Sequence, residues 1–432
     1  MKLKQFITTT LVTAMTLAPL GFLAHKQDIQ ASEKTKVTFW HGWAGDEAKK
    51  LAKIIDEFNT SQDEIEVDVL DSQSRDAILT ALTGTDGPDL VYNMDYMANQ
   101  WGHAGLLRPL DDLIESSGID LKNTVQSELE IVKIDDEHYG IPYTMDVFKL
   151  FYNKKILDEF GFEAPKTLEE MLEQSKEIAK LNGDKYERLG YVPDFPWIES
   201  TLIAHKFGAE LWDPDKKELM FPSEQWTKAL EYKNKYYSDF DSKKVLTFKS
   251  GFGAYDSPEN PFFQGKVAFA IEGEWYPTFI KEYAPKDFEW GSVAIPASET
   301  YPEGSKKEEI SAGMLMINTK SKVAEAAFKF ISWLKEDQHY LDFCIAKGSL
   351  PTTYSAMKSD RIEKEAPDLK PFVDVVLEAE PQSGPAVSFF SEMIRQLKAA
   401  EEKVYSGELE PNDAYQEAAD NLEDSVQEER DR

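Results

Sequence analysis

Two glutamates and a tryptophan follow a regular apolar run, and together they form the strongest candidate for a binding site. Residues 267–271 alternate large and small apolar side chains, which is typical of a strand buried on both faces of a sheet. The run ends in Glu272, Gly273, Glu274 and Trp275, at the strand end where open α/β sheets place their ligands. Carboxylates and an indole beside a glycine turn predict a site for a polar ligand with an apolar face.

The same two glutamates also raise an enzyme hypothesis, with Glu272 and Glu274 as the acid and base of a glycosidase. On one strand they would point to the same side, and such spacing arises easily by chance in a chain with 79 acidic residues. The sequence has no G-x-S-x-G, H-E-x-x-H, P-loop or complete G-x-G-x-x-G motif, and its six His are scattered. We therefore predict no catalytic residue, no metal site and no cofactor. A secreted polysaccharide-active enzyme stays as the alternative.

Further candidates follow the predicted strands near the N-terminus. They are His41, Trp43 and Glu47 after the first strand, Asp71 after the second, and Asn93 and Asp95 after the third. The carboxyl ends of parallel strands share one edge of a sheet, so we expect these side chains to gather there. Two of them have an alternative interpretation, because Glu47 suits the first turn of a helix and Asp95 suits a helix N-cap.

The order of predicted elements indicates an α/β fold. Strands at 36–40, 65–69 and 89–92 alternate with helices at 46–59, 75–82 and 96–103. This β-α-β-α-β order predicts a parallel sheet flanked by helices. Later helices are expected at 223–237, 322–335, 388–405 and from 411 onward.

Several local predictions rest on single motifs. Thr167 and Glu170 form a capping box, which predicts a helix that continues to Leu181 and stops at the following Asn-Gly pair. Gly265 is expected to cap a helix that ends at 263–266. The polar run 304–309 indicates a surface loop, and the charged end 423–432 is expected to fray.

Motifs spread over most of the chain resemble those of one known family. Phe263, Gly265, Lys266, Ala268, Gly273 and Trp275 fit the pattern F-x-x-G-K-x-A-M-x-x-x-G-x-W, with Phe269 in place of Met. P-D-L-V at 88–91, G-L-L-x-P-L-D at 105–111 and Y-G-I-P at 139–142 fit as well. The sequence thus resembles the extracellular solute-binding proteins of sugar ABC importers, the maltose-binding-protein-like group.

This resemblance implies a two-lobe periplasmic-binding-protein-like fold of type II, with a mainly parallel sheet flanked by helices in each lobe and a hinge between them. It implies lobes at 32–144 with 314–358 and at 145–313 with 359–432. The implied function is an extracytoplasmic receptor that captures a sugar, with an oligosaccharide favoured, by hinge closure and delivers it to an ABC importer. The implied partners are a carbohydrate ligand and the permease subunits, and the receptor itself is expected to be a monomer.

The resemblance also adds candidate binding residues. Relatives carry an acidic sugar contact at the position of Asp146 and a stacking aromatic in the loop of Trp197. Ser311 and Gly313 lie near the expected hinge return, where small residues allow close backbone approach. Phe389, Phe390 and Arg395 lie in a helix start that supplies a stacking aromatic in relatives, although Phe replaces their usual Trp or Tyr. Arg395 has the alternative of an inter-lobe salt bridge.

Charge and chain ends limit the partners. The net charge of −31 argues against nucleic acid and anionic membrane surfaces. Residues 1–31 read as a signal peptide, and its removal takes three Lys and one Asp, which leaves about −33. An uncleaved anchor is the alternative.

The single Cys344 is expected to be buried and inert, and no lipid-modified Cys follows the signal segment. A peptide, a polyamine or a metal chelate is the alternative ligand class.

Overall fold

The N-terminal sheet has the predicted β-α-β-α-β order. The computed structural model describes residues 33–196 and 200–431. Its first strands run parallel in the order β3-β1-β2, with β1 at Thr35–Trp40, β2 at Ile65–Leu70 and β3 at Leu90–Met94. The intervening helices are α1 (Gly45–Ser61), α2 (Arg75–Thr83) and α3 (Asp95–His103). Alternate buried side chains such as Val37 and Phe39 fix the face of β1 that packs into the core.

The rest of this first lobe is mostly helical. It contains α4 (Asp111–Ser117), α5 (Gln126–Glu130), α12 (Ala324–Leu334), α13 (Asp337–Lys347), α14 (Tyr354–Met357), the 3-10 turn η1 (Leu121–Asn123) and the hairpin β4 (Lys133–Ile134) with β5 (Glu137–His138). Cys344 is buried on α13, as predicted. Within the described ranges, no helix is both long enough and apolar enough to cross a membrane.

The second lobe has a sheet of a different kind. Its central strand β7 (Lys149–Asn153) pairs antiparallel with both β12 (Phe269–Glu272) and β13 (Trp290–Val293). The expectation of a mainly parallel sheet in each lobe therefore does not extend to these three strands. The helices of this lobe are α6 (Lys154–Phe160), α7 (Leu168–Ile178), α8 (Ser200–Lys206), α9 (Glu224–Ser238), α10 (Ser242–Lys249) and α11 (Tyr276–Tyr283). Two short hairpins complete it. One is formed by β8 (Lys180–Asn182) and β9 (Lys185–Arg188), and the other by β10 (Trp212–Asp213) and β11 (Glu218–Leu219).

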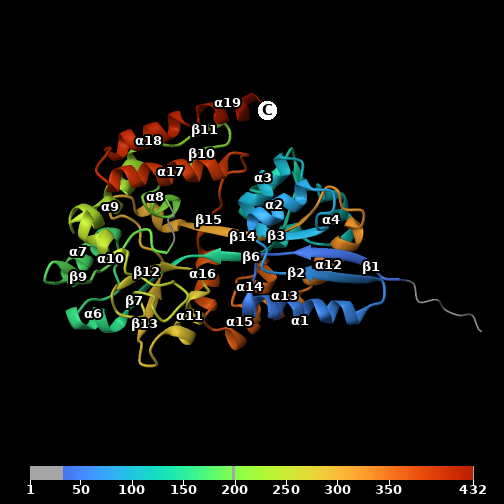
Figure 1. The fold of residues 1–432 in the computed structure, drawn as a ribbon, viewed down its shortest axis with the longest axis horizontal. Coiled ribbons are helices and arrows are strands. Elements are labelled where there is room, and N and C mark those ends of the chain that lie inside the picture. The colour runs from blue at the N-terminus through green and yellow to red at the C-terminus, as the bar shows by residue number, and fades with distance from the viewer. Residues whose placement is uncertain (1–32, 197–199, 432) are drawn as a thin grey trace, which may run out of the picture.

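One long strand connects the two halves. β14 (Lys307–Ile317) pairs antiparallel with β6 (Ile141–Val147) along one edge and with β3 along the other. Its first three residues pair parallel with β15 (Glu380–Gln382). Figure 1 shows β6, β14 and β15 lying between the two lobes. Each lobe is therefore tied to the other through hydrogen bonds of a shared strand.

The start of β14 corrects the prediction of a surface loop at 304–309. A 3-10 turn, η2 (Pro302–Lys306), leads directly into the strand. Glu308 is only 3% exposed, and its Oε1 lies 2.9 Å from Nζ of Lys206, which is 1% exposed. Lys206 Nζ also donates to the carbonyl of Lys307. Ser305 and Lys306 are exposed, as predicted, whereas Glu308 is internal because its charge is paired and hydrogen-bonded.

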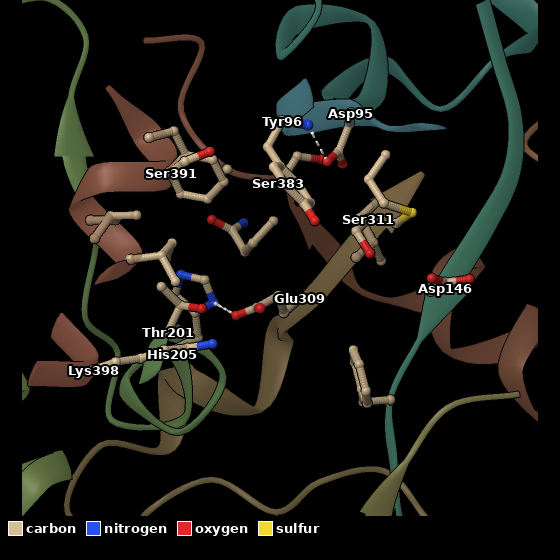
Figure 2. A pocket seen from close by; sticks show the side chains of 18 of the residues that line it. Asp95, Tyr96, Asp146, Thr201, His205, Glu309, Ser311, Ser383, Ser391 and Lys398 are labelled. Atoms are coloured by element: carbon tan, nitrogen blue, oxygen red, sulfur yellow. Dashed lines mark hydrogen bonds and ion pairs between the residues drawn. The ribbon is translucent and has the colours of Figure 1, made fainter. Parts of the chain in front are cut away.

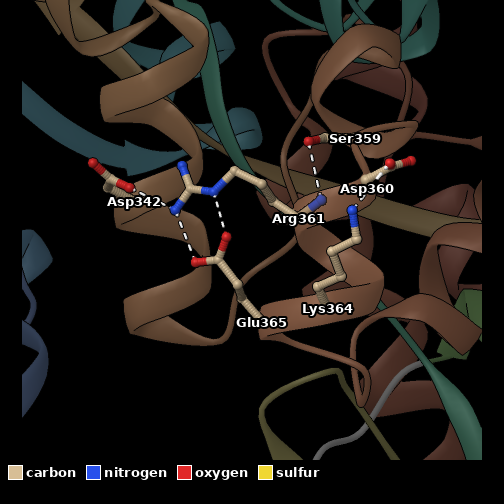
Figure 3. A network of polar contacts seen from close by, with 6 residues as sticks. All are labelled: Asp342, Ser359, Asp360, Arg361, Lys364 and Glu365. Carbon is tan, nitrogen blue, oxygen red and sulfur yellow. Dashed lines mark hydrogen bonds and ion pairs between the residues drawn. The ribbon is translucent and has the colours of Figure 1, made fainter.

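The C-terminal segment is mostly helical, apart from β15 and the residues around it. It contains α15 (Asp360–Glu365), α16 (Lys370–Glu378), α17 (Phe390–Tyr405), α18 (Pro411–Asp420) and α19 (Glu423–Asp431). Arg361 holds α15 against α13 by donating to Asp342 at 2.7 Å and to Glu365 at 2.6 Å (Figure 3). The end expected to fray is α19, and Arg430 Nε donates to the carbonyl of Lys217 at 3.0 Å.

Lys206→Met should be strongly destabilising, because it leaves the Glu308 carboxylate buried without its partner. We expect a loss of about 3–5 kcal/mol in the free energy of unfolding. The double variant Lys206→Met with Glu308→Leu should recover most of that loss, since no charge is then buried alone. Urea unfolding of the three proteins measures both values. A single variant that unfolds like the wild type would show that the pair does not hold β14 in place.

Candidate functional site

A cavity of about 580 Å³ lies beside the strands that connect the lobes, and we call it the cleft cavity. Both lobes contribute to its lining, which draws on β6, the start of α3, α8, the first half of β14 and the cavity-facing side of α17. Figure 2 shows Asp95 and Tyr96 above the middle of β14, with Thr201 and His205 entering from α8. A ligand in this space would touch both lobes and the strands that join them.

Five of the predicted binding residues line the cleft cavity. They are Asp95, Asp146, Trp275, Ser311 and Arg395. Asp146 on β6 pairs directly with Ser311 on β14, so the register of these two strands brings them side by side. Their contact with a ligand stays a prediction.

The other candidates lie elsewhere. His41, Trp43, Glu47, Asp71, Asn93, Glu274, Gly313 and Phe389 are absent from the cavity lining, and Trp197 lies outside the described residues. The aromatic pair after β1 is packed instead: His41 is 1% exposed, and the Trp43 ring centroid lies 3.9 Å from that of Tyr92. Burial lowers the pKa of His41 to about 4 even though the charge of Asp71 raises it. Glu47 forms an ion pair of 3.2 Å with Lys347.

Gly313 has a packing role that its sequence position did not reveal. A Cβ added there would lie 1.7 Å from the hydroxyl oxygen of Tyr92, so only glycine lets this ring cross β14. The Tyr92 hydroxyl in turn shares a hydrogen bond of 2.6 Å with Thr144. The small residue therefore serves the shared strand, because it lets the first lobe's side chain reach β6.

Of the two aromatic residues expected at the start of α17, Phe390 lines the cleft cavity and Phe389 does not. Phe389 is 8% exposed and packs edge-on against Trp212, with ring centroids 5.7 Å apart. Its neighbour Phe390 lines the cavity and faces Tyr96 with centroids 6.4 Å apart. Adjacent residues at a helix start point in different directions, and the sequence alone did not fix which one turns inward.

Trp275 forms an aromatic wall of the cavity at the end of β12. Its indole folds back over Gly273, where an added Cβ would lie 2.2 Å from the ring. Phe148 packs edge-to-face on the indole with centroids 5.8 Å apart. These two contacts fix the ring orientation, so the cavity presents a rigid apolar surface beside Asp146 and Ser311.

Glu274 lies behind this wall, where its carboxyl group interacts with that of Asp146. It is 2% exposed, and the Val147 N–H donates to its Oε2 at 3.2 Å. Burial, and then the charge of Asp146, raise the pKa of Glu274 well above its usual range. Burial also raises the pKa of Asp146, while the nearby charge of Lys347 lowers it. Protonated Glu274 thus supports the carboxylate that faces the cavity.

A second carboxyl pair lies on the opposite side of β14. Asp95 accepts hydrogen bonds from Tyr96 N at 2.6 Å and from Ala312 N at 3.0 Å. Burial raises its pKa to about 6 and raises that of Glu128 well above the usual range, so protonated Glu128 donates to Asp95. Ser383, in the cavity lining, donates to Glu128 at 2.9 Å. Glu128 was not predictable as a site residue, because one acidic residue in a short helix carries no motif.

Three further side chains, Glu309, His205 and Arg395, were missed or differently assigned. Glu309 and His205 line the cavity side by side, with His205 Nδ1 3.2 Å from Glu309 Oε2 (Figure 2). The loop prediction for 304–309 concealed Glu309. Arg395 pairs with Glu392 one turn earlier in α17, so the alternative of an inter-lobe salt bridge is wrong for the described structure. Across residues 33–196 and 200–431, no group of three or more potential metal-ligating side chains is arranged around a common point.

The family model for bacterial extracellular solute-binding proteins matches residues 53–370. The chain belongs to this family. It is 23% identical to the maltotriose-binding protein of Pyrococcus abyssi over 341 aligned residues. This alignment covers 76% of this chain and 69% of that protein. It is 26% identical to the galactooligosaccharide-binding protein of Bacillus subtilis over 236 aligned residues. This alignment covers 52% of this chain and 51% of that protein.

Solved structures agree with the fold of this solute-binding protein. CpMnBP1 with bound mannobiose has a TM-score of 0.78 at 22% identity, over 89% of this chain and 99% of that one. The sugar-binding protein MalE of Xanthomonas citri has a TM-score of 0.73 at 23% identity, over 92% of this chain and 98% of that one. The two-lobe fold predicted from the sequence is confirmed.

Glu128→Gln should change how stability depends on pH. The folded protein keeps the Glu128 proton at pH values where the unfolded chain has released it, so wild-type stability falls as the pH rises above the ordinary carboxyl range. Gln retains a donor for Asp95 but does not titrate. The variant should therefore lose less stability than the wild type between about pH 4 and about pH 8.

Urea unfolding at both pH values measures the difference. Glu130→Gln, at an exposed position of the same helix, is the matched control and should keep the wild-type pH slope. If Glu128→Gln also keeps that slope, the shared proton is not part of the folded structure.

Proposed function

We propose that this protein captures an oligosaccharide outside the cytoplasm and delivers it to an ABC importer. The observation that carries the proposal is the wall of Trp275 and Phe148 beside Asp146 and Ser311 in the cleft cavity. Sugar rings offer C–H surfaces to an aromatic face and hydroxyls to polar groups at its edge. The oligosaccharide ligands named for the similar proteins of Pyrococcus abyssi and Bacillus subtilis support the same ligand class.

Binding would follow from hinge closure. A sugar stacks on Trp275 from the second lobe and reaches Asp95 and Tyr96 in the first, so closing the lobes buries both faces. Trp197 stays a proposed additional stacking residue. The proposed lobes comprise residues 32–144 with 314–358 and residues 145–313 with 359–432. Stacking and charge-assisted hydrogen bonds together are consistent with roughly micromolar affinity, about −8 kcal/mol.

The cellular setting completes the proposal. Residues 1–31 direct export as a signal peptide, and the receptor works as a monomer in a periplasm or at the outer cell surface. Its closed form presents both lobe surfaces to the permease subunits. Retention then depends on the signal segment or on a partner, because no lipid-modified Cys follows that segment.

Catalysis has less support than binding. The family consists of binding proteins. Neither Glu272 nor Glu274, the pair considered for a glycosidase, contributes to the lining of the cleft cavity. A polyamine ligand is also less favoured, because Arg75, Arg395 and Lys398 line the cavity with positive charge.

Trp275→Ala tests the proposal. Losing a large aromatic contact of about 1.5–3 kcal/mol should weaken sugar binding roughly ten- to a hundredfold. Isothermal titration calorimetry of the mature chain against mannobiose, maltotriose and galactooligosaccharides identifies the ligand and measures the change. Trp275→Phe keeps a ring and should retain most of the affinity. Unchanged affinity in Trp275→Ala would remove the central contact of the proposal.

A further inference from the structure

The cleft cavity has a positively charged side in an otherwise acidic protein. The chain has 79 acidic residues against 48 Lys and Arg. In the cavity lining the numbers of basic and acidic residues are equal. The basic residues are Arg75, Arg395 and Lys398, and the acidic residues are Asp95, Asp146 and Glu309. The lining is thus enriched in cations relative to the whole chain, and a solute-binding protein uses such a bias to choose its ligand.

The three lining carboxyl groups already interact with the protein itself. Asp95 accepts two backbone hydrogen bonds, from Tyr96 and Ala312. Asp146 lies near Lys347, whose charge lowers the pKa of Asp146, and Glu309 lies 3.2 Å from His205. Their negative charge is therefore partly compensated before any ligand enters.

Lys398 is the lining cation whose charge is least compensated. Ser391, Ile394, Arg395 and Lys398 follow three- and four-residue spacing, so one face of α17 supplies all four to the cavity. Lys398 is half-buried, and it forms no ion pair with any carboxylate of residues 33–196 and 200–431. By contrast, Arg395 pairs with Glu392.

The surroundings of Lys398 suit an anionic group. Figure 2 shows its side chain extending from α17 toward Thr201 and His205, which lie one turn apart on α8. Phe390 and Ser391, in the first turn of the 16-residue α17, also line the cavity. A half-buried ammonium group is stabilised when a ligand supplies the missing counter-charge.

We propose that the cleft cavity selects a sugar that carries a carboxylate or phosphate group, with Lys398 binding the oxyanion beside the Thr201 hydroxyl. Trp275, on a different part of the lining, stacks on the sugar ring. This inference rests on the proposed function and adds to it the charge of the ligand. Lys398 then determines specificity for charge, whereas the aromatic wall contributes affinity for any sugar ring.

Calorimetry with matched neutral and acidic sugars tests this selection. The pairs are galactobiose with digalacturonate, mannobiose with its uronic acid counterpart, and glucose with glucose 6-phosphate. At least one acidic member should bind about tenfold more tightly than its neutral partner, and high salt should reduce this preference. A preference confined to uronates assigns a carboxylate ligand, and one confined to glucose 6-phosphate assigns a phosphate ligand.

Variants on α17 separate charge recognition from folding. Lys398→Gln should lower the acid-to-neutral affinity ratio about tenfold without weakening the neutral sugar, and Lys398→Arg should largely preserve the ratio. Lys403→Gln is the matched control, since Lys403 pairs with Glu417 outside the cavity.

Equal affinities for the neutral and the acidic sugar within every matched pair would overturn the inference. An unchanged acid-to-neutral affinity ratio in Lys398→Gln would overturn it as well. Neutral sugars that still bind through Trp275 would leave the proposed function intact, whereas no sugar binding at all would overturn both.

Discussion

The structure depends on a strand that the two lobes share. β14 is paired along both edges, with β6 on one side and with β3 or β15 on the other. Its hydrogen bonds cannot be broken in one lobe without exposing backbone groups in the other, so the lobes stay in register. Because β14 and β6 also line the cleft cavity, the same constraint places the polar ligand groups at the point where the lobes meet. Rigid strands at the junction restrict motion to rotation of the lobes about them.

This arrangement explains why so many acidic groups lie in one small region. Asp95 and Asp146 flank the middle of β14, and each has a second carboxyl group, Glu128 or Glu274, buried behind it. Two carboxylates side by side in a protein interior cannot both be ionised, so each pair retains a proton. Each pair then behaves as one negative charge.

Regular elements were predictable from the sequence, whereas their long-range pairing was not. The β-α-β-α-β opening and the Thr167 cap follow from local periodicity and capping chemistry, and both are present. The helix from Thr167 was expected to reach Leu181 but ends at Ile178, because Lys180–Asn182 form β8 and Gly183 and Asp184 form the turn of the β8–β9 hairpin. Gly265 has the expected left-handed conformation, at φ 66°, but it lies in a turn and caps no helix. Glu128, Glu309 and Lys398 enter the site only through tertiary contacts, which sequence spacing does not encode.

The central claim is that a ligand closes the two lobes over the strands they share. Cys344 is buried, so Lys53→Cys on α1 and Lys235→Cys on α9 would be the accessible thiols for a pair of spin labels, one in each lobe. The inter-label distance is then measured by pulsed electron paramagnetic resonance with and without the sugar found by calorimetry. The account predicts a shorter and narrower distance distribution when the sugar is bound. Tight sugar binding with an unchanged distribution would contradict it.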